Sequence, residues 1–330
     1  MITGRALVTI GQAEPGAPGG KQMAVYAMGI VGGNRPSTYS RSPALWNEWC
    51  ELVSFPGYFE AHDVAESDIR AFLRSVWNRT DFADLTVTNP YKRLAFDVFR
   101  KSIEERPGPF GNARRSLADV WVDPAARRLQ AMNHLIRGPG GTPTRLENTD
   151  GRGLVAEVPA SVWRDARVLI IGAGGAALSV ADALVGLSAS LSLTDLDAND
   201  ADAAVRQVSD SHRAHTVSAL PFLCLSTPEI ASVLEQTDVV VAAVSGGSPL
   251  SSDYLRAHAG RLTVIDTRYG SDALTFDAAR SAGVTAYDGL FMLFGQFASA
   301  ARLVADLHGI PTGRNERALN RLRSRFLVRQ

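Results

Sequence analysis

A glycine-rich segment, GAGGAA at residues 172–177, is the first feature whose residue types and spacing suggest a particular chemistry. It follows an apolar run at residues 167–171 that predicts a strand, and it opens a stretch with helical periodicity. Gly172 permits a tight turn, Gly174 lets the backbone approach a pyrophosphate, and Ala177 permits close packing of helix on strand. The helix start would add free N–H groups and the positive end of its dipole. The segment predicts a dinucleotide-binding loop; a tight turn that binds no ligand is the alternative.

An acidic residue after the next predicted strand supports the same interpretation. Asp195 follows the β-rich run at residues 189–194, 23 residues after Gly172. Its carboxylate can accept both ribose hydroxyls of an adenosine and would repel a 2′-phosphate, and no arginine occurs in residues 194–199. This pattern favours NAD over NADP, although a strand-end turn rich in Asp and Asn is an ordinary alternative. The cofactor contacts predicted from this region are Gly172, Ala173, Gly174, Gly175, Ala176 and Asp195.

Lys92 and Asp150 are a candidate pair for proton transfer. When a hydride leaves a secondary alcohol, the hydroxyl proton must leave as well, and a positioned lysine and carboxylate can share that task. Taken alone, however, Lys92 after Pro-Tyr is typical of a surface helix, and Asp150 within Asn-Thr-Asp-Gly is typical of a turn. The two residues therefore need a wider context before a role can be assigned.

The elements that must position these residues alternate along the chain. Up to residue 150, we expect strands at residues 25–31, 58–64 and 84–88, a hairpin from 131–137 and 144–148, and helices starting at Pro43, Ser67 and Pro90. After it, we expect strands at 167–171, 189–194, 238–244, 262–266 and 284–287, separated by helices. Continuous apolar strands of this kind are typical of a parallel sheet buried on both faces. The apolar stretch 290–304 predicts a helix that packs back on the first domain.

The predicted fold class is α/β, with two domains and a cleft between them. Residues 1–22 are expected to be a flexible extension. Residues 23–150 are expected to form an α/β substrate domain, completed by C-terminal helices within 288–330. Residues 151–287 are expected to form a Rossmann-type, doubly wound parallel-sheet domain that binds NAD.

Five separated motifs in this order resemble those of the shikimate/quinate dehydrogenase family. They are SRSP at 40–43, TVTNPYK at 86–92, AMN at 131–133, NTDG at 148–151 and DGLFMLFGQ at 288–296. The resemblance runs from about Met23 to about Leu307. It implies an NAD-dependent oxidoreductase that moves a hydride reversibly between nicotinamide and a ring hydroxyl of shikimate, quinate or a close analogue. Its partner would be a small polyhydroxy ring carboxylate, and the protein would be a monomer or homodimer.

The resemblance also implies roles for individual residues. Lys92 would be the general acid/base, and Asp150 would orient it and bind a ring hydroxyl. The hydroxyls of Ser40 and Ser42 could bind the substrate carboxylate, although Ser42 before Pro43 could equally cap a helix. The further substrate contacts are Thr88, Asn133, Tyr269 and Gln296, and Val244 and Gly289 join the cofactor contacts.

Several positions depart from the usual family pattern and suggest a divergent, catabolic or secondary-metabolic branch. Tyr39 replaces a histidine, Thr86 an asparagine and His134 a threonine, and the strand that usually ends in Asn-Ala-Thr-Ser reads AAVS. Phe291 replaces a glycine that would lie near the nicotinamide, so we expect it to reshape the face on which the hydride moves. Two alternatives stay open: the same chemistry on an amino-substituted ring, and a non-catalytic metabolite-binding protein. Retention of Lys92 and Asp150 speaks against the second.

Composition excludes several other classes. The 330 residues are 45% hydrophobic, and 34 basic residues balance 34 acidic ones, which argues against nucleic acid or anionic lipid as a partner. Cys50 and Cys224 stand in unrelated contexts, which predicts no disulfide and a cytoplasmic location. No uninterrupted apolar run of membrane-spanning length occurs. His212 and His215 lack accompanying ligands, so no metal site is expected.

Overall fold

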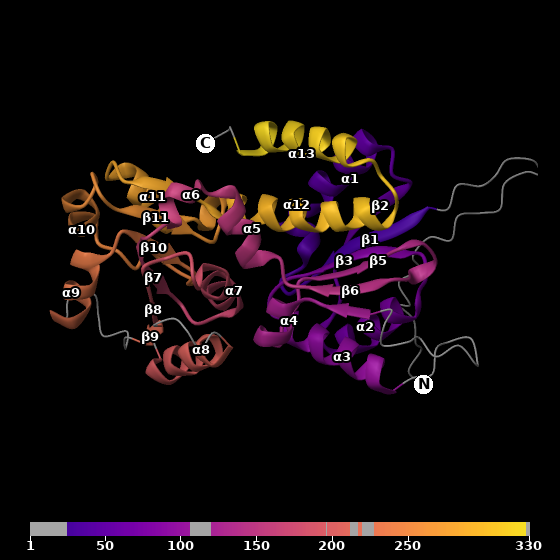
Figure 1. Cartoon of the computed structure of the whole chain (residues 1–330), viewed down its shortest axis with the longest axis horizontal. Helices are drawn as coiled ribbons and strands as arrows, with labels where there is room; N and C mark the ends of the chain where they lie inside the picture. Colours follow the sequence, from indigo (N-terminus) through magenta and orange to yellow (C-terminus); the bar gives the residue numbers. More distant parts are fainter. Residues whose placement is uncertain (1–24, 106–119, 196, 212–216, 220–227, 328–330) are drawn as a thin grey trace, which may run out of the picture.

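A computed structural model describes residues 25–105, 120–195, 197–211, 217–219 and 228–327 (Figure 1). The extension predicted for residues 1–22 lies outside this range, as do Cys224, His212 and His215. Two sheets lie side by side, and helices cover both faces of each (Figure 1). The predicted α/β class with two sheet domains is confirmed.

The first sheet is mixed and has the strand order β2-β1-β3-β5-β6-β4. Its strands are β1 (Tyr26–Val31), β2 (Gly57–His62), β3 (Phe82–Val87), β4 (Val120–Val122), β5 (His134–Arg137) and β6 (Thr144–Glu147). The predicted hairpin is the antiparallel pair β5–β6, and β5 also runs antiparallel to β3. Strand β4 escaped prediction because a strand of only three residues shows no period.

Helices from both ends of the chain cover this sheet. They are α1 (Ser42–Val53), α2 (Ile69–Asn78), α3 (Lys92–Glu105), α4 (Pro124–Leu129), α12 (Gly289–Leu307) and α13 (Thr312–Leu327), with short 3-10 turns at Pro36–Thr38, Glu66–Asp68 and Pro139–Gly141. Helices α1, α12 and α13 bury their apolar side chains on one face, and α2 and α3 cover the other (Figure 1). The expectation that the stretch 290–304 packs back on the first domain is confirmed.

Helix α12 is long and apolar enough to cross a membrane by length and composition alone. In the folded chain 61% of that apolar window is buried, against α5, α13 and the first sheet. Its composition is therefore explained by a place in the protein core.

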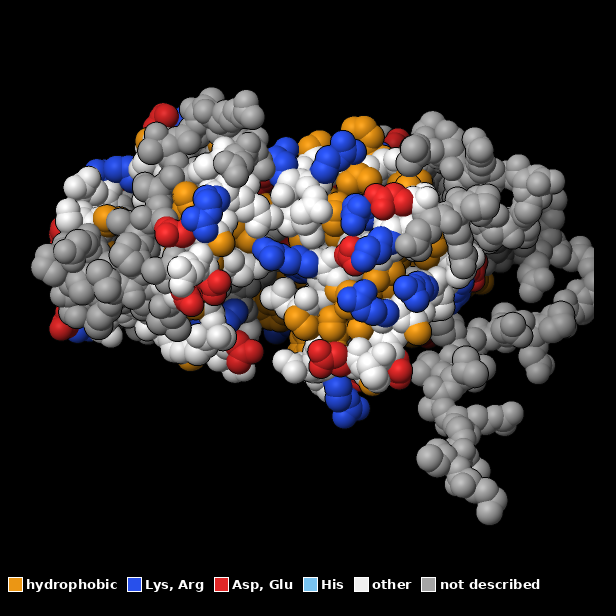
Figure 2. Space-filling view, turned by 90° about the horizontal axis from the view of Figure 1, so that it is seen from below, with side chains coloured by type: hydrophobic (Ala, Val, Ile, Leu, Met, Phe, Trp, Pro, Cys, Tyr) orange, Lys and Arg blue, Asp and Glu red, His pale blue; other side chains and the backbone are white. Residues whose placement is uncertain are grey.

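On the face shown in Figure 2, basic and acidic side chains are interspersed.

The second sheet has six parallel strands in the order β12-β11-β10-β7-β8-β9. The strands are β7 (Arg167–Ile171), β8 (Ser190–Thr194), β9 (Val217–Ala219), β10 (Val239–Ala242), β11 (Thr263–Asp266) and β12 (Thr285–Tyr287). The helices are α7 (Gly175–Leu184), α8 (Ala198–Ser211), α9 (Pro228–Gln236), α10 (Ser252–Ala257) and α11 (Leu274–Ser281), with a 3-10 turn at Gly270–Asp272. The strand order reverses between β7 and β10, and ligands bind at such a point in doubly wound sheets.

The junction between the halves is built around α5 (Asp150–Glu157), which α6 (Ala160–Trp163) follows. Helix α5 crosses α12 where Gly153 meets Gly295 (Figure 1). A Cβ on Gly295 would lie 2.0 Å from the Gly153 carbonyl oxygen, and a Cβ on Gly153 would lie 2.4 Å from the Gln296 nitrogen. Only glycine allows this approach, which brings Asp150 at the start of α5 close to Gln296 on α12.

Candidate active site

A cavity of about 320 Å³ opens between the two sheets and takes its walls from both. One wall comes from β3 and the starts of α1, α3 and α5, and the other from the loops after β10 and β11 and from α12. Most residues expected to touch substrate line it: Ser40, Ser42, Thr88, Lys92, Asp150, Tyr269 and Gln296. Of the expected cofactor contacts, Ala176, Val244 and Gly289 line it too.

Lys92 and Asp150 form an ion pair in the wall of this cavity. Lys92 is the first residue of α3 and Asp150 the first of α5, so two helix starts converge on one point. The Lys92 side chain is 13% exposed and that of Asp150 is 2% exposed. A buried carboxylate needs a positive partner, so the pairing holds the Lys92 amine at the cavity surface.

Asn133 lies behind Asp150 and is fully buried. Its side-chain nitrogen is 2.9 Å from Asp150 Oδ1, 2.8 Å from Gln296 Oε1 and 3.0 Å from Thr149 Oγ1. Its oxygen accepts the Thr149 backbone N–H at 2.8 Å. Because an amide carries two N–H bonds and meets three acceptors, this site is saturated within the protein. Asn133 therefore orients Asp150 and Gln296, and its predicted contact with substrate stays a prediction.

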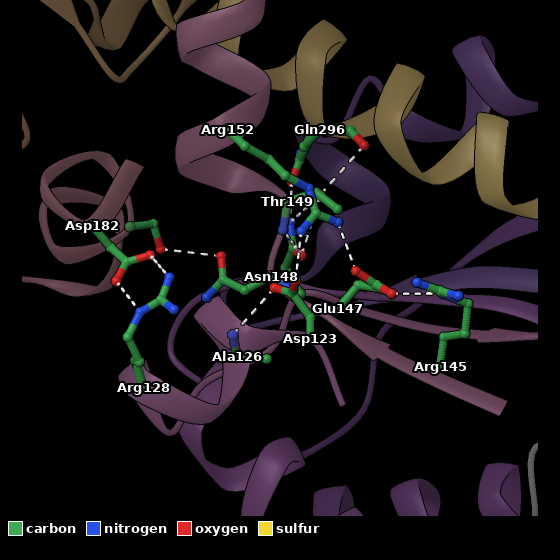
Figure 3. A network of polar contacts seen from close by, with 12 residues as sticks. Asp123, Ala126, Arg128, Arg145, Glu147, Asn148, Thr149, Arg152, Asp182 and Gln296 are labelled. Carbon is green, nitrogen blue, oxygen red and sulfur yellow. Dashed lines mark hydrogen bonds and ion pairs between the residues drawn. The ribbon is translucent and has the colours of Figure 1, made fainter. Parts of the chain in front are cut away.

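A second layer of charged contacts holds the segment that carries Asp150 (Figure 3). Arg152 donates to Asp123 at 2.9 Å and to Glu147 at 2.7 Å, and Arg145 donates to the other oxygen of Glu147 at 2.7 Å. Asp123 also accepts the backbone N–H of Asn148 at 3.2 Å. Glu147 and Asp123 are both buried and paired with these arginines. Their charged hydrogen bonds therefore fix the turn from β6 into α5.

An ion pair also ties the two halves together (Figure 3). Arg128 on α4 donates two hydrogen bonds of 2.7 Å to the Asp182 carboxylate on α7. Ser179, also on α7, lies 3.2 Å from the Asn148 side-chain oxygen. Helix α7 follows the glycine-rich loop, so these contacts set the distance between that loop and the Lys92–Asp150 pair.

Ser40 and Ser42 line the cavity just before and at the start of α1. The N-cap of α1 is Arg41, which makes no side-chain capping bond, so the alternative that Ser42 caps this helix is wrong. Instead the Ser42 backbone N–H donates to the Ser40 hydroxyl oxygen at 3.2 Å. The Arg41 guanidinium lies 5.6 Å from the centre of the Tyr269 ring. A cation therefore lies over Tyr269, a residue of the same cavity, which is a feature that sequence reasoning missed.

Two phenols complete this end of the cavity. Tyr39 and Tyr269 both line it, and Tyr39 donates its hydroxyl to the Gly33 carbonyl at 2.9 Å. Burial raises the pKa of Tyr39 and that of Tyr269 above the usual value of 10.0. Both hydroxyls are therefore neutral at physiological pH and can hydrogen-bond to a polar ligand.

The glycine-rich loop has the geometry that its sequence predicts. Gly172 has a φ of +118°, and a Cβ there would lie 2.5 Å from the Ala243 carbonyl oxygen, so glycine is needed where the loop passes the end of β10. Nothing lies within 4 Å of the position that a Cβ on Gly174 would take, at the N-cap of α7. Asp195 Oδ2 accepts the Ala173 backbone N–H at 2.6 Å. An open helix start with a carboxylate beside it fits the phosphates and ribose of a dinucleotide.

Comparison with known proteins agrees with this geometry. A family model described as the shikimate dehydrogenase substrate binding domain matches residues 31–105. The shikimate dehydrogenase (NADP(+)) of Acidiphilium cryptum is 30% identical over 275 residues, covering 81% of this chain and 86% of that protein. The enzyme of the same name from Methylobacterium radiotolerans is 30% identical over 285 residues, with the same coverage. The chain belongs to the shikimate dehydrogenase family.

Solved structures of similar fold include proteins with different substrates. Quinate dehydrogenase from Corynebacterium glutamicum, in complex with NAD, has a TM-score of 0.66 at 23% identity and covers 91% of this chain and 99% of its own. Shikimate 5-dehydrogenase from Listeria monocytogenes, with shikimate and NAD, has a TM-score of 0.67 at 18% identity, covering 89% and 96%. The 5-ketofructose reductase of Gluconobacter sp. strain CHM43 has a TM-score of 0.64 at 19% identity, covering 91% and 99%. These likenesses show the fold. With the family relatives, they identify an NAD(P)-dependent dehydrogenase of the shikimate/quinate type.

Phe291, which departs from the family pattern, packs against a neighbouring aromatic ring and is not among the residues that line the cavity. Phe291 packs edge-on against Tyr287, with ring centres 5.0 Å apart, while Gly289 and Met292 line the cavity. Successive residues of an α-helix are about 100° apart, so Phe291 lies about 200° from Gly289. Met292, by contrast, returns to the same face. The expectation that Phe291 reshapes the hydride-transfer face is not supported, and it is Met292 on this turn of α12 that lines the cavity.

Other cavity residues went unnoticed in the sequence. Thr86 on β3 lines the cavity, and its position two residues before Thr88, just past the end of that strand, could have revealed it, because alternate residues of an extended chain share a face. Arg268 also lines the cavity, with its guanidinium on Asp266 at 3.1 Å and on the Gly246 carbonyl at 2.6 Å. No sequence signal distinguishes Arg268 from a surface arginine, since its pairing depends on the ends of two adjacent strands.

Proposed function

We propose that this protein transfers a hydride reversibly between NAD and a ring hydroxyl of shikimate, quinate or a close analogue. The observation that carries the proposal is the Lys92–Asp150 ion pair in the wall of a cavity shared by both sheets. Ala176, in the first turn of α7, lines the same cavity, so the helix start that would hold the cofactor adjoins it. We further propose that it works in the cytoplasm, as its free, buried Cys50 suggests.

The proton-transfer step depends on how tightly Lys92 is held. NAD(P), when bound, would supply or accept the hydride at its nicotinamide ring. Asp150 binds Lys92 through one oxygen and Asn133 through the other, so the amine has one defined position. In the reducing direction Lys92 donates a proton to the nascent alkoxide oxygen, and in the oxidising direction its neutral form accepts that proton.

The remaining polar residues suit a polyhydroxy ring carboxylate. Ser40 and Ser42 would hydrogen-bond the carboxylate. The Arg41 guanidinium, which lies over the Tyr269 ring, would add a positive charge near that end of the cavity. Gln296 accepts from Asn133 through its oxygen, so its amide N–H groups are oriented away from that contact and can donate to a ring oxygen. Thr88 and Tyr269 would hold further hydroxyls.

The preference for NAD rests on Asp195. Its carboxylate lies beside the glycine-rich loop, where a 2′-phosphate would meet like charge. The shikimate dehydrogenases of Acidiphilium cryptum and Methylobacterium radiotolerans are named for NADP(+), so this preference separates the chain from those two relatives. Replacing Asp195 with Asn keeps an acceptor for the Ala173 N–H but removes the charge. We expect the ratio of kcat/KM for NADP to that for NAD to rise about tenfold, and a wild-type preference for NADP would contradict the assignment.

The direct test is a spectrophotometric screen for reduced nicotinamide. Shikimate, quinate and amino-substituted analogues are each offered with NAD and with NADP. We expect reduction with at least one ring acid and faster reduction with NAD. Reduction of the amino analogues alone would move the substrate to that class. Binding of ring acids without any reduction would show a metabolite-binding protein instead of an enzyme.

A further inference from the structure

Three polar side chains form a buried cluster beneath the substrate wall: Asp84, Thr86 and His134. Asp84 and Thr86 are alternate residues of β3 and so point to the same face of the sheet. His134 lies directly opposite Thr86 on the antiparallel strand β5. Two of these positions, Thr86 and His134, are departures from the usual family pattern that lie far apart in sequence and meet here.

The cluster is linked by hydrogen bonds. His134 Nδ1 lies 2.8 Å from Asp84 Oδ1, and the Thr86 hydroxyl lies 3.0 Å from Asp84 Oδ2. Thr86 Oγ1 is also 3.4 Å from His134 Nδ1, at the limit of a hydrogen bond. The Asp84 carboxylate is therefore engaged at both oxygens, once by an imidazole and once by a hydroxyl.

This cluster is unusual because its surroundings are apolar. Asp84, Thr86 and His134 are all nearly or fully inaccessible to solvent. Ile30 pairs with Thr86 in the sheet and Ile136 pairs with Asp84, and both belong to the apolar core beneath α1 and α12. A buried carboxylate is costly unless it is fully hydrogen-bonded, and an apolar replacement is often equally stable. Fold stability alone therefore gives little reason for Asp84 and His134 to be here.

The cluster reaches the ligand through Thr86, which lines the cavity beside Thr88 and Lys92. A threonine hydroxyl has one hydrogen and two acceptor lone pairs. A carboxylate is an acceptor, so the Thr86 hydrogen is directed at Asp84, and the proton on His134 Nδ1 is directed at the other Asp84 oxygen. Any hydrogen bond that the Thr86 oxygen makes with a ligand in the cavity is then one that it accepts.

We propose that Thr86 is a specificity-determining residue that accepts a hydrogen bond from a donor on the substrate ring. Asp84 and His134 are positioning residues that hold the Thr86 hydrogen away from the ligand. The inference rests on the proposed function and narrows its substrate class. The ring must carry a hydroxyl or protonated amine facing Thr86, and a keto, ether or fluorine substituent there is disfavoured because it brings a second acceptor against the first.

The test compares ligands that differ only in the donor. In a shikimate series, each non-reacting ring hydroxyl is replaced in turn by fluorine, which is small and cannot donate. We expect one ring position at which fluorine lowers kcat/KM by about tenfold to a hundredfold in the wild-type protein. Binding of the same ligands, measured by calorimetry, should show the same ratio without depending on turnover.

Three variants of Thr86 separate the chemistry of its oxygen from its shape. Thr86→Ser keeps the hydroxyl and should keep the hydroxyl-to-fluorine ratio within about twofold. Thr86→Val removes the oxygen and should bring the ratio close to one. If Thr86→Val fails to fold because Asp84 loses a partner, Thr86→Asn serves instead. Its amide still donates to Asp84 and offers the cavity a donor as well as an acceptor, so the ratio should again fall about tenfold.

The outcomes separate this inference from the proposed function. Turnover of ring acids with no fluorine-sensitive position would overturn the inference and leave the function standing. The same holds if Thr86→Val or Thr86→Asn retains the wild-type ratio. Ligand binding with the expected ratio but without turnover would support the inference and sink the enzymatic proposal. Absence of both binding and turnover would remove both.

Discussion

The two walls of the cleft are built in different ways. On the substrate side, side chains form the surface, and each is held by others behind it, as Asp150 is by Lys92 and Asn133. On the cofactor side, backbone forms the surface, and the position for a Cβ on Gly174 is open space. Asp195, the charged residue among the expected cofactor contacts, is hydrogen-bonded to the loop itself.

The difference between the two walls reflects how each ligand is recognised. A ring with several hydroxyls is distinguished by donors and acceptors at defined points, which side chains supply when they are held in place. A pyrophosphate is bound by N–H groups and a helix dipole, which need close approach of the backbone. Removing a side chain should therefore harm the substrate wall, and adding one should harm the cofactor wall.

The largest effect should follow from Lys92→Ala. Loss of the general acid/base should lower kcat by about 10²–10⁴-fold while ring-acid and cofactor affinity change little. Because Asp150 would lose its ion pair, circular dichroism should confirm that the variant is folded. The matched control is Lys101→Ala on the same helix, where the lysine pairs with Asp97 at the surface and kcat should not change. Unchanged turnover in Lys92→Ala would remove this residue from the mechanism.

Adding a side chain at Gly174 should have the next largest effect. Gly174 has a φ of −73°, which any residue can adopt, and a Cβ there meets no protein atom within 4 Å. Gly174→Val should lower NAD(P) affinity by about tenfold to a hundredfold, measured by fluorescence titration, with a stability change below about 1 kcal/mol. Gly172→Val, at positive φ and against Ala243, should destabilise the fold itself. Wild-type affinity in Gly174→Val would show that the loop does not hold the pyrophosphate.

A smaller effect on catalysis should follow from Asn133→Ala, because Asn133 orients Asp150 and Gln296. We expect kcat to fall about tenfold and cofactor affinity to stay unchanged. Asn47→Ala is the control, since Asn47 also uses both ends of its amide, on the backbone of Phe59. Both variants should lose about 1–3 kcal/mol in denaturant unfolding, but only Asn133→Ala should lower kcat. Equal kcat values in Asn133→Ala and Asn47→Ala would mean that Asn133 has only a structural role.

The smallest effect should come from a residue in neither wall. Hydrogen bonds from Arg167 lower the pKa of Asp238 from 3.8 to about 2. A carboxyl whose pKa is lower in the folded protein stabilises it above pH 3.8, and that contribution is lost as the pH falls through about 2. Asp238→Asn should be slightly less stable at neutral pH, and the gap from wild type should narrow between pH 3.8 and 2. Unfolding midpoints across this range provide the measurement, and a gap independent of pH would contradict the assignment.

Much of the cofactor half could be predicted because its signals are local. The apolar strands at residues 167–171 and 262–266 and the glycine-rich loop occupy short windows in which period and spacing are visible. Strand β10 ended at Ala242, earlier than the apolar run suggested, since the chain must turn there toward Gly246. Strand β9 was missed for the same reason as β4, its length of three residues.

The substrate half was harder to predict because its site depends on contacts across the chain. The motif resemblance pointed to Lys92, Asp150 and Gln296, but nothing in their spacing shows which atoms meet. The position of Phe291, by contrast, could have been predicted from the sequence. Counting residues around α12 places its ring away from the cavity.

By itself, the sequence determined the α/β class, and it singled out the glycine-rich loop and the candidate proton-transfer pair. Each of these follows from residue types within a short window or from motifs in a characteristic order. Only the tertiary structure shows that Asn133 hydrogen-bonds to Asp150 and Gln296, and that Thr86 meets Asp84 and His134. The reason is physical: Asn133 and Gln296 are 163 residues apart, and strand register and the crossing of α5 on α12 bring them within hydrogen-bonding distance.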